Sequence, residues 1–197
     1  KEVQMTQEID LSLIVAMTPT GLIGRNYGLP WGRIPSDMRF FSKITKAAEV
    51  VIAGNGTYQS YVAAIGGPLK GRKNVVLSRR FTSHGTFHES VLYVGSVEEA
   101  CEVVSNYGGR AFIVGGAEIY KAFLHTRLVS RVYVTMVHAP ELTGDTYFPF
   151  YPDFHRYYRE TGATATRRWD ERDAHETSRA VFTRILQPEP EPELIAA

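Results

Sequence analysis

Several protein classes are excluded by what this 197-residue chain lacks. It has one cysteine, Cys101, so no intramolecular disulfide can form and a cysteine-based metal site is not expected. No apolar run reaches the roughly 18 residues that a membrane-spanning helix needs. The polar start, Lys1–Asp10, has no apolar stretch typical of a signal peptide. We therefore expect a protein of a reducing compartment, the cytoplasm, with no membrane partner.

A charge surplus is also missing. Lys and Arg total 22 against 21 Asp and Glu, which gives a net charge of +1 and no electrostatic reason to expect a nucleic-acid partner. The six histidines are scattered without metal-ligand spacing, so we expect no metal. Hydrophobic residues at 44% and aromatic residues at 12% are typical of a globular protein with a sizeable core.

Short apolar runs that alternate with helix-like segments are the main architectural signal. Strands are predicted at Leu11–Met17, Glu49–Ala53, Asn74–Ser78, Val91–Val94, Ala111–Val114, Arg131–Val137 and Arg179–Leu186. Helices are predicted after the N-cap Ser36, from Thr57, after the capping box Ser96–Glu99, and from Ala117 to about Leu124.

Because these runs are nearly continuous in apolar residues, they favour parallel strands buried on both faces. The segment Tyr157–Leu186 is more typical of an antiparallel hairpin. The predicted fold class is therefore α/β, with a mostly parallel central sheet, helices on both of its faces and an antiparallel C-terminal hairpin. We expect a single domain at residues 10–186, with flexible tails at residues 1–9 and 187–197.

Two glycine-rich turns each follow an apolar run and open a helix: Gly54-Asn55-Gly56-Thr57 and Gly115-Gly116-Ala117. Glycine lets backbone N–H groups approach a phosphate, and a helix N-terminus favours negative charge. Neither turn matches a P-loop or a dinucleotide fingerprint, so each alone is equally compatible with ordinary turn chemistry. Two such turns at one sheet edge favour a phosphate-bearing ligand.

Asp37 is the acid with the most unusual setting. It starts a helix beside Met38, Phe40 and Phe41, shortly after Leu29-Pro30-Trp31. An acid in the first helical turn is commonly there because the helix dipole stabilises it. An apolar environment would instead desolvate the carboxylate and raise its pKa, which suits proton transfer.

Several segments, taken in order, resemble one family. They are LSLIVAMTPTGLIGRNYGLPWGRIPSDMRFF (11–41), PLKGR followed by NVVLSR, IVGGAEIY (113–120) and GDTYFP (144–149). Over residues 11–186 the chain resembles the dihydrofolate reductase family. That resemblance implies the family's fold and NADPH-dependent reduction of 7,8-dihydrofolate to 5,6,7,8-tetrahydrofolate, supporting one-carbon and thymidylate metabolism. Two alternatives are a riboflavin-pathway pyrimidine reductase of similar fold and a non-catalytic folate-binding protein.

The resemblance also implies roles for individual residues. Asp37 would bind the pterin and help to protonate it, supported by Thr135 and by a water held at Trp31, while Tyr120 would lie against the nicotinamide. The implied substrate-binding residues are Ile14, Val15, Asp37, Met38, Phe41, Ser60, Tyr61, Leu69, Arg72, Val114 and Thr135. The implied cofactor-binding residues are Ala16, Ile23, Gly54, Asn55, Gly56, Thr57, Leu77, Ser78, Arg79, Gly115, Gly116, Ala117, Glu118, Ile119 and Tyr120.

Among these residues, Arg72 would pair with the α-carboxylate of the substrate's glutamate tail. Ser78 and Arg79 would meet the 2′-phosphate of NADPH. The bond Gly115–Gly116 would match a cis peptide of the family. Antifolate inhibitors are further expected ligands, and we expect a monomer.

Four positions depart from the family's usual pattern. Asn55 and Gly95 stand where basic residues are common, Tyr58 replaces a frequent Trp, and Tyr61 replaces a frequent Ile. The first two changes predict a weaker hold on the cofactor phosphates.

Overall fold

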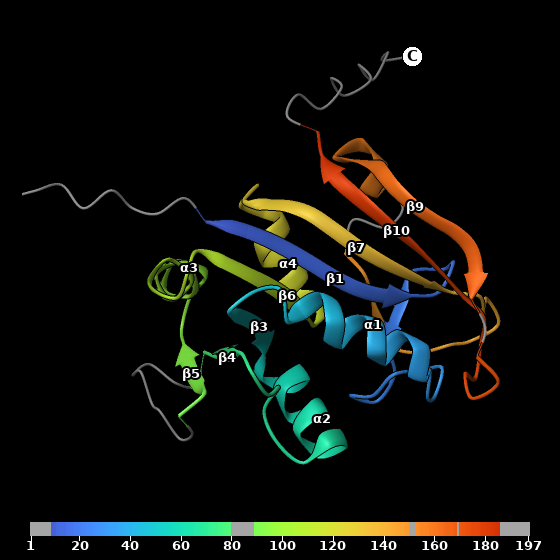
Figure 1. The fold of residues 1–197 in the computed structure, drawn as a ribbon, viewed down its shortest axis with the longest axis horizontal. Coiled ribbons are helices and arrows are strands. Elements are labelled where there is room, and N and C mark those ends of the chain that lie inside the picture. Colours follow the sequence, from blue (N-terminus) through green and yellow to red (C-terminus); the bar gives the residue numbers. More distant parts are fainter. Residues whose placement is uncertain (1–8, 80–88, 150–152, 169, 186–197) are drawn as a thin grey trace, which may run out of the picture.

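A computed structural model describes residues 9–79, 89–149, 153–168 and 170–185 of the chain (Figure 1). Its main sheet has eight strands in the order β5-β4-β3-β6-β1-β7-β10-β9. They are β1 (Asp10–Met17), β3 (Val50–Gly54), β4 (Lys73–Leu77), β5 (Val91–Val94), β6 (Arg110–Gly115), β7 (Val129–Val137), β9 (Tyr158–Arg168) and β10 (Thr177–Arg184).

The pairing of these strands confirms the predicted fold class. All neighbours from β5 to β7 are parallel, and β10 runs antiparallel to both β7 and β9. The helices are α1 (Pro35–Thr45), α2 (Asn55–Ile65), α3 (Val97–Asn106) and α4 (Ala117–His125), with a short 3₁₀ helix at Asp153–Arg156.

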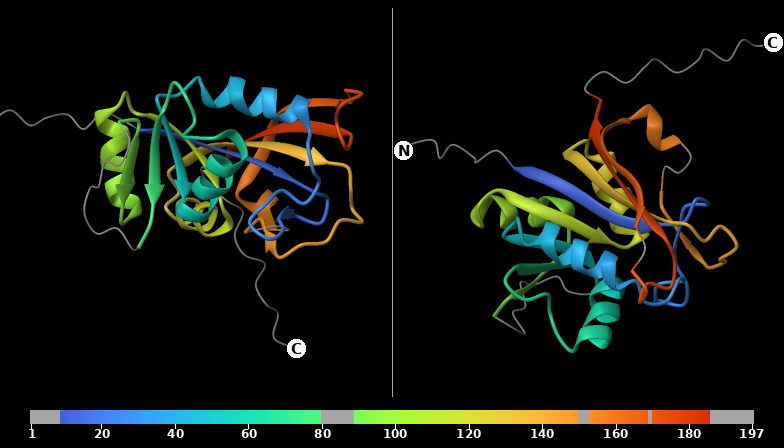
Figure 2. Two further views of the ribbon diagram at one scale, coloured as in Figure 1. Left: turned by 90° about the horizontal axis from the view of Figure 1, so that it is seen from below. Right: turned by 45° about the vertical axis from the view of Figure 1, so that its right-hand side comes forward.

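Side chains that alternate along each strand are buried on the two opposite faces of the sheet. Leu13 of β1 and Ile52 of β3 belong to the larger apolar cluster, to which α3 and α4 contribute. Their neighbours Ile14 and Val51 point the other way, into a cluster that Phe40, Phe41 and Ile44 of α1 cover. Figure 2 shows α1 lying along one face of the sheet and α4 on the other.

The start of α1 differs from the prediction. Ile34 occupies the N-cap position and makes no side-chain cap, and Pro35 is the first helical residue. Ser36 is therefore inside the helix, and the prediction of Ser36 as N-cap was wrong. Proline at the first turn needs no N–H donor, and the N–H of Ser36 finds its acceptor in the side chain of Asp173, 2.9 Å away.

Two further differences concern short segments. Helix α2 begins at Asn55, two residues before the predicted Thr57. The strands β2 (Leu22–Gly24) and β8 (Thr146–Tyr147) pair in a separate two-stranded sheet that the sequence did not indicate. Ser96 is confirmed as an N-cap, because its hydroxyl accepts from the N–H of Glu99 at 3.1 Å. The Glu99 carboxylate accepts from the N–H of Gly95 at 2.8 Å in place of the N–H of Ser96.

No helix within the described ranges is both long and apolar enough to cross a bilayer. Within the same ranges, no group of three or more His, Cys, Asp or Glu side chains is arranged to hold a metal ion.

Candidate active site

Asp37 lies half-buried in the first turn of α1, facing the end of β7. The Thr135 hydroxyl of β7 donates a hydrogen bond to its carboxylate. Burial raises the pKa of Asp37 above the ordinary 3.8, and the Asp173 carboxylate adds to the rise, whereas Thr135 and the cation of Arg179 oppose it. The carboxyl group thus holds a proton more readily than a solvated aspartate does.

An apolar wall extends from Asp37 along the face of the sheet under α1. Five of the residues predicted to bind the substrate meet here in one cluster: Ile14, Phe41, Tyr61, Leu69 and Val114. Met38 stands beside Asp37 on α1, and 44% of its surface is exposed. Val15 does not join them, because its side chain packs in the cluster on the opposite face of the sheet.

Trp31 and Ala16 lie at the end of this wall nearest the start of α1. Trp31 is buried with Ile34 and Val137, and Ala16 packs against this group. Ala16 is paired with Thr135 across β1 and β7, so the end of β1 lies directly beside the hydrogen-bond partner of Asp37.

Arg72 is buried at the far end of α1. Its guanidinium donates to the hydroxyl of Thr45, the last residue of the helix, and to the carbonyl of Lys70 at 3.3 Å. Desolvation lowers the pKa of Arg72, but an arginine remains charged at neutral pH. The site therefore has a fixed cation at one end of α1 and a carboxyl group at the other.

Asn74 fixes the segment that precedes β4. It is fully buried, and its amide nitrogen donates to the carbonyls of Leu69 and Arg72 at 3.0 Å each. Its amide oxygen accepts from the N–H of Leu69 and from the hydroxyl of Tyr61, again at 3.0 Å each. Neither Asn74 nor Thr45 was among the predicted site residues. A polar side chain at the start of an apolar strand is a signal that could have pointed to Asn74.

The two glycine-rich turns meet at the carboxyl edge of the sheet. A Cβ atom at Gly54 would lie only 2.8 Å from Cγ1 of Ile119, and one at Gly116 would lie 3.1 Å from the Thr57 hydroxyl. Helices α2 and α4 thus begin against each other's turns. The bond Gly115–Gly116 is cis, as the resemblance implied.

These two helix starts suit the diphosphate of a dinucleotide. The N-cap residues are Gly54 and Gly116, and neither helix has a side-chain cap, so backbone N–H groups at both starts can bind an anion. Asn55, Gly56 and Thr57 form the first turn of α2, and Ala117 and Glu118 open α4. The predicted cofactor-binding turns therefore fit such a group.

Tyr120 connects this edge with the substrate wall. Its hydroxyl donates to the carbonyl of Ile14 at 2.8 Å. A Cβ atom at Gly115 would lie 3.3 Å from the hydroxyl oxygen of Tyr120. Complete burial raises the pKa of Tyr120, so the phenol stays protonated and remains a donor.

The other predicted cofactor residues are distributed around the same edge. Leu77 is paired with Gly54, which puts Ser78 and the exposed Arg79 next to the first glycine turn. Arg80, which follows them, is outside the described residues. Ile23 lies on β2 and packs against the larger cluster, and Ser60 lies on α2.

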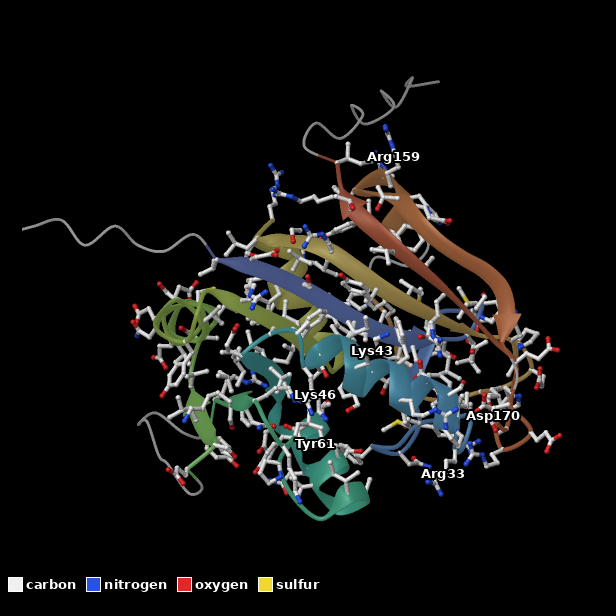
Figure 3. All side chains as sticks on the ribbon, viewed as in Figure 1. Arg33, Lys43, Lys46, Tyr61, Arg159 and Asp170 are labelled. Atoms are coloured by element: carbon white, nitrogen blue, oxygen red, sulfur yellow. The ribbon has the colours of Figure 1, made fainter. Side chains whose placement is uncertain are left out.

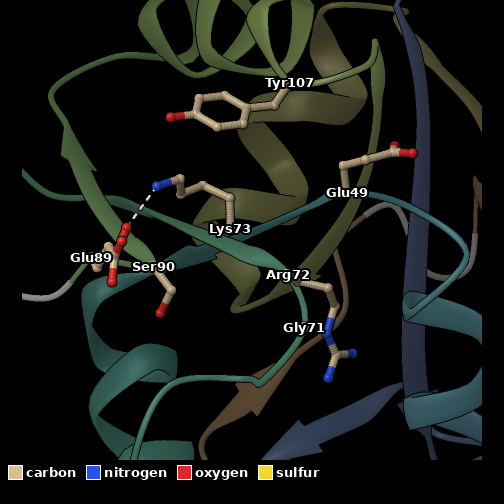
Figure 4. Close-up of a pocket in the computed structure, with 7 residues that line it drawn as sticks. All are labelled: Glu49, Gly71, Arg72, Lys73, Glu89, Ser90 and Tyr107. Atoms are coloured by element: carbon tan, nitrogen blue, oxygen red, sulfur yellow. Dashed lines mark hydrogen bonds between the residues drawn. The ribbon is translucent and has the colours of Figure 1, made fainter.

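An open surface hollow of about 500 Å³ lies at the opposite edge, where β3, β4 and β5 begin. Its lining residues are Glu49, Gly71, Arg72, Lys73, Glu89, Ser90 and Tyr107. Figure 4 shows that the Lys73 ammonium points toward Glu89, whose carbonyl it reaches at 2.7 Å, while the Arg72 guanidinium points away from it. None of these lining residues belongs to the apolar wall, and Arg72 is the one that the substrate prediction also includes.

Comparison with known proteins agrees with this geometry. The family described as dihydrofolate reductase matches residues 10–184, nearly all of the described chain. The chain belongs to the dihydrofolate reductase family. A dihydrofolate reductase of Haemophilus influenzae is 36% identical over 138 residues, which are 70% of this chain and 78% of that protein. A type 3 dihydrofolate reductase of Salmonella typhimurium is 36% identical over 141 residues, covering 72% of this chain and 79% of the relative.

A solved structure of the family shares the fold. Dihydrofolate reductase from Enterococcus faecalis, complexed with NADP(H) and RAB-propyl, superposes with a TM-score of 0.74 at 26% identity. The match covers 89% of this chain and 96% of the other. The glycine turns and the apolar wall therefore belong to a dihydrofolate reductase architecture.

Proposed function

We propose that this chain reduces 7,8-dihydrofolate to 5,6,7,8-tetrahydrofolate at the expense of NADPH. The observation that carries the proposal is Asp37, a half-buried carboxyl group of raised pKa at the end of an apolar wall. The membership of the chain in the dihydrofolate reductase family supports it, as does the complex of the Enterococcus faecalis relative with NADP(H).

NADPH, when bound along the two glycine turns, supplies the hydride. The backbone N–H groups that open α2 and α4 bind its diphosphate. Tyr120, whose hydroxyl reaches the carbonyl of Ile14, and Ala16, which lies beside Thr135, would border the nicotinamide. Ser78 and Arg79 bind the 2′-phosphate.

The wall formed by Ile14, Phe41, Leu69 and Val114 orients the pterin ring and excludes water from it. The Asp37 carboxyl group hydrogen-bonds the ring and provides the proton that reaches N5, by way of a water held near Trp31. Thr135 keeps the carboxyl group in place. Catalysis is mainly positioning, because hydride and proton must reach adjacent ring atoms.

Arg72 binds the α-carboxylate of the glutamate tail at the other end of α1. A guanidinium fork suits two carboxylate oxygens, and the bonds to Thr45 and Lys70 hold it in one orientation. Antifolates that carry a pterin-like ring use the same wall. We further propose that residues 10–186 form one domain that acts as a monomer.

Loss of the near-ultraviolet absorbance of NADPH on addition of dihydrofolate tests the function. Turnover supports the proposal. Tight binding of dihydrofolate without turnover would instead indicate a folate-binding protein, and turnover of a pyrimidine of the riboflavin pathway in place of dihydrofolate would indicate the other reductase.

A further inference from the structure

The loop 170–176, between β9 and β10, is bonded to the first turn of α1. One carboxylate oxygen of Asp173 accepts from the N–H of Ser36 at 2.9 Å, and the other accepts from the N–H of Asp170 at 3.2 Å. The N–H of Ala174 donates to the carbonyl of Arg33 at 3.0 Å. Figure 3 shows Arg33 and Asp170 at the end of the molecule where α1 begins. A side chain 137 positions away along the chain and a backbone N–H of the same loop thus hold the start of the helix that carries Asp37.

Arg179 of β10 reaches the same turn from the sheet. Its guanidinium donates to the carbonyl of Ser36 at 3.1 Å and lies 4.3 Å from the centre of the Phe40 ring. Arg179 is also directly opposite Thr135 in the antiparallel pair of β10 and β7. Residues opposite each other in such a pair project from the same face of the sheet, so Arg179 and Thr135 approach Asp37 together.

The charged groups around Asp37 therefore come from two elements and have opposite signs. The cation of Arg179 favours the ionised carboxylate, and the buried carboxylate of Asp173 favours the protonated form. Thr135, from β7, favours the ionised form through its hydrogen bond. Because the site is partly desolvated, these charges act on Asp37 more strongly than they would in water.

We propose that Asp173 and Arg179 are positioning residues for Asp37, which fix the first turn of α1 and set, with opposite signs, how readily its carboxyl group retains a proton. The inference rests on the proposed function, in which Asp37 provides the proton for N5.

Two variants that each remove one charge test this inference. Asp173→Asn keeps an oxygen that can accept from Ser36 but removes the negative charge. Arg179→Gln keeps a polar side chain that can donate a hydrogen bond, although a shorter one, and removes the positive charge. If the hydride-transfer rate follows the protonated fraction of Asp37, it falls above a pH midpoint. That midpoint should move down in Asp173→Asn and up in Arg179→Gln, whereas a purely structural role would lower the rate in both and leave the midpoint in place.

A second measurement does not depend on turnover. Titration of the Asp37 carboxyl carbon by ¹³C NMR in the free protein, assigned by its absence in Asp37→Asn, should show the same two opposite shifts. Arg172→Gln is the matched control. It makes the same charge change as Arg179→Gln, in the loop that carries Asp173. Arg172 is exposed and pairs with Asp170, so the midpoint of Asp37 in this variant should stay at the wild-type value.

Opposite shifts relative to the control support the proposal. Shifts of the same sign, or none, in the NMR titration overturn it. Absence of turnover in the wild type would overturn the proposed function, while the carboxyl titration would still decide the inference. If thermal melting shows that Asp173→Asn does not fold, Arg179→Gln and Arg179→Lys decide, because the lysine keeps the charge and should restore the midpoint that the glutamine moves.

Discussion

The guanidinium of Arg72 donates a hydrogen bond to the hydroxyl of Thr45, which in turn donates to the carbonyl of Phe41 at 2.7 Å. Thr45 ends α1 and is wholly buried, while Asp37 lies in the first turn of the same helix. Thr45 follows Asp37 by eight residues, which at about 1.5 Å per residue span about 12 Å along the helix axis. One helix therefore sets the separation between the proposed proton source and the proposed carboxylate-binding group.

Thr45→Val should weaken the binding of dihydrofolate more than it slows turnover. The change removes a hydrogen bond to a charged group, worth about 1.5 kcal/mol or more, so KM should rise about tenfold with little change in kcat. Steady-state kinetics check this, with Thr45→Ser as the conservative variant that keeps the hydroxyl and should stay near wild type. Equal losses in kcat and kcat/KM would show that Thr45 does not contribute to binding the glutamate tail of the substrate.

Asn74→Ala should destabilise the fold by about 3 kcal/mol, because it leaves buried N–H and carbonyl groups of Leu69 and Arg72 without their partner. The midpoint of urea unfolding should fall at an unchanged slope. Asn106→Ala, at an exposed position at the end of α3, is the control and should change stability by less than about 0.5 kcal/mol. Similar midpoints for the two variants would contradict the role given to Asn74.

Asp37→Asn should stabilise the folded protein at neutral pH. The pKa of Asp37 is raised in the folded state, so ionisation there costs free energy that the unfolded chain does not pay. Wild-type stability should therefore fall as the pH rises from about 3.8 through the folded pKa, and the advantage of the neutral Asn should disappear at lower pH. Unfolding free energies across this range test the prediction, and an Asn variant less stable than wild type at pH 7 would contradict it.

Asp145 is the matched comparison with the opposite sign. The N–H of Asn26 donates to its carboxylate at 2.8 Å and lowers the pKa of Asp145. Its contribution to stability is present above the ordinary 3.8 and disappears as the pH falls through the lowered value. Asp145→Asn should thus reduce stability at neutral pH, where Asp37→Asn increases it.

Arg79→Ala should remove most of the preference for NADPH over NADH. Arg79 and Ser78 are the groups proposed for the 2′-phosphate, and Asn55 and Gly95 are neutral. One charge-assisted contact of about 1.5–3 kcal/mol gives a preference of roughly 10- to 10²-fold in kcat/KM. The kinetics with NADH should be nearly unchanged in Arg79→Ala, and Asn55→Arg should widen the preference, most visibly at low salt. If Arg79→Ala kept the full preference for NADPH over NADH, another residue would have to bind the 2′-phosphate.

The sequence was sufficient for the sheet and for most of the apolar wall. Nearly continuous apolar runs require burial on both faces, which in an α/β chain leaves few arrangements beside parallel strands covered by helices. The resemblance implied the wall residues Ile14, Phe41, Leu69 and Val114, and they lie in one cluster of the structure.

Contacts between distant segments could not be predicted in the same way. Serine is a common N-cap residue, yet the helix starts at Pro35 and Ser36 lies inside it. Asp173, 137 residues away, accepts a hydrogen bond from the N–H of Ser36. The position of Val15 is a different case, because strand alternation alone puts its side chain on the face opposite to that of Ile14. Arg179 and Asp173 carry no local signal, since their partners lie on α1.

The most direct test compares hydride transfer from NADPH to dihydrofolate in the wild type and in Asp37→Asn at neutral pH. The variant should keep the fold and the binding of NADPH, because Asp37 lies apart from the glycine turns. Its rate should be lower by about 10²-fold or more, because the group that provides the proton is gone. Turnover close to that of the wild type would contradict the account, since a different group would then have to supply the proton.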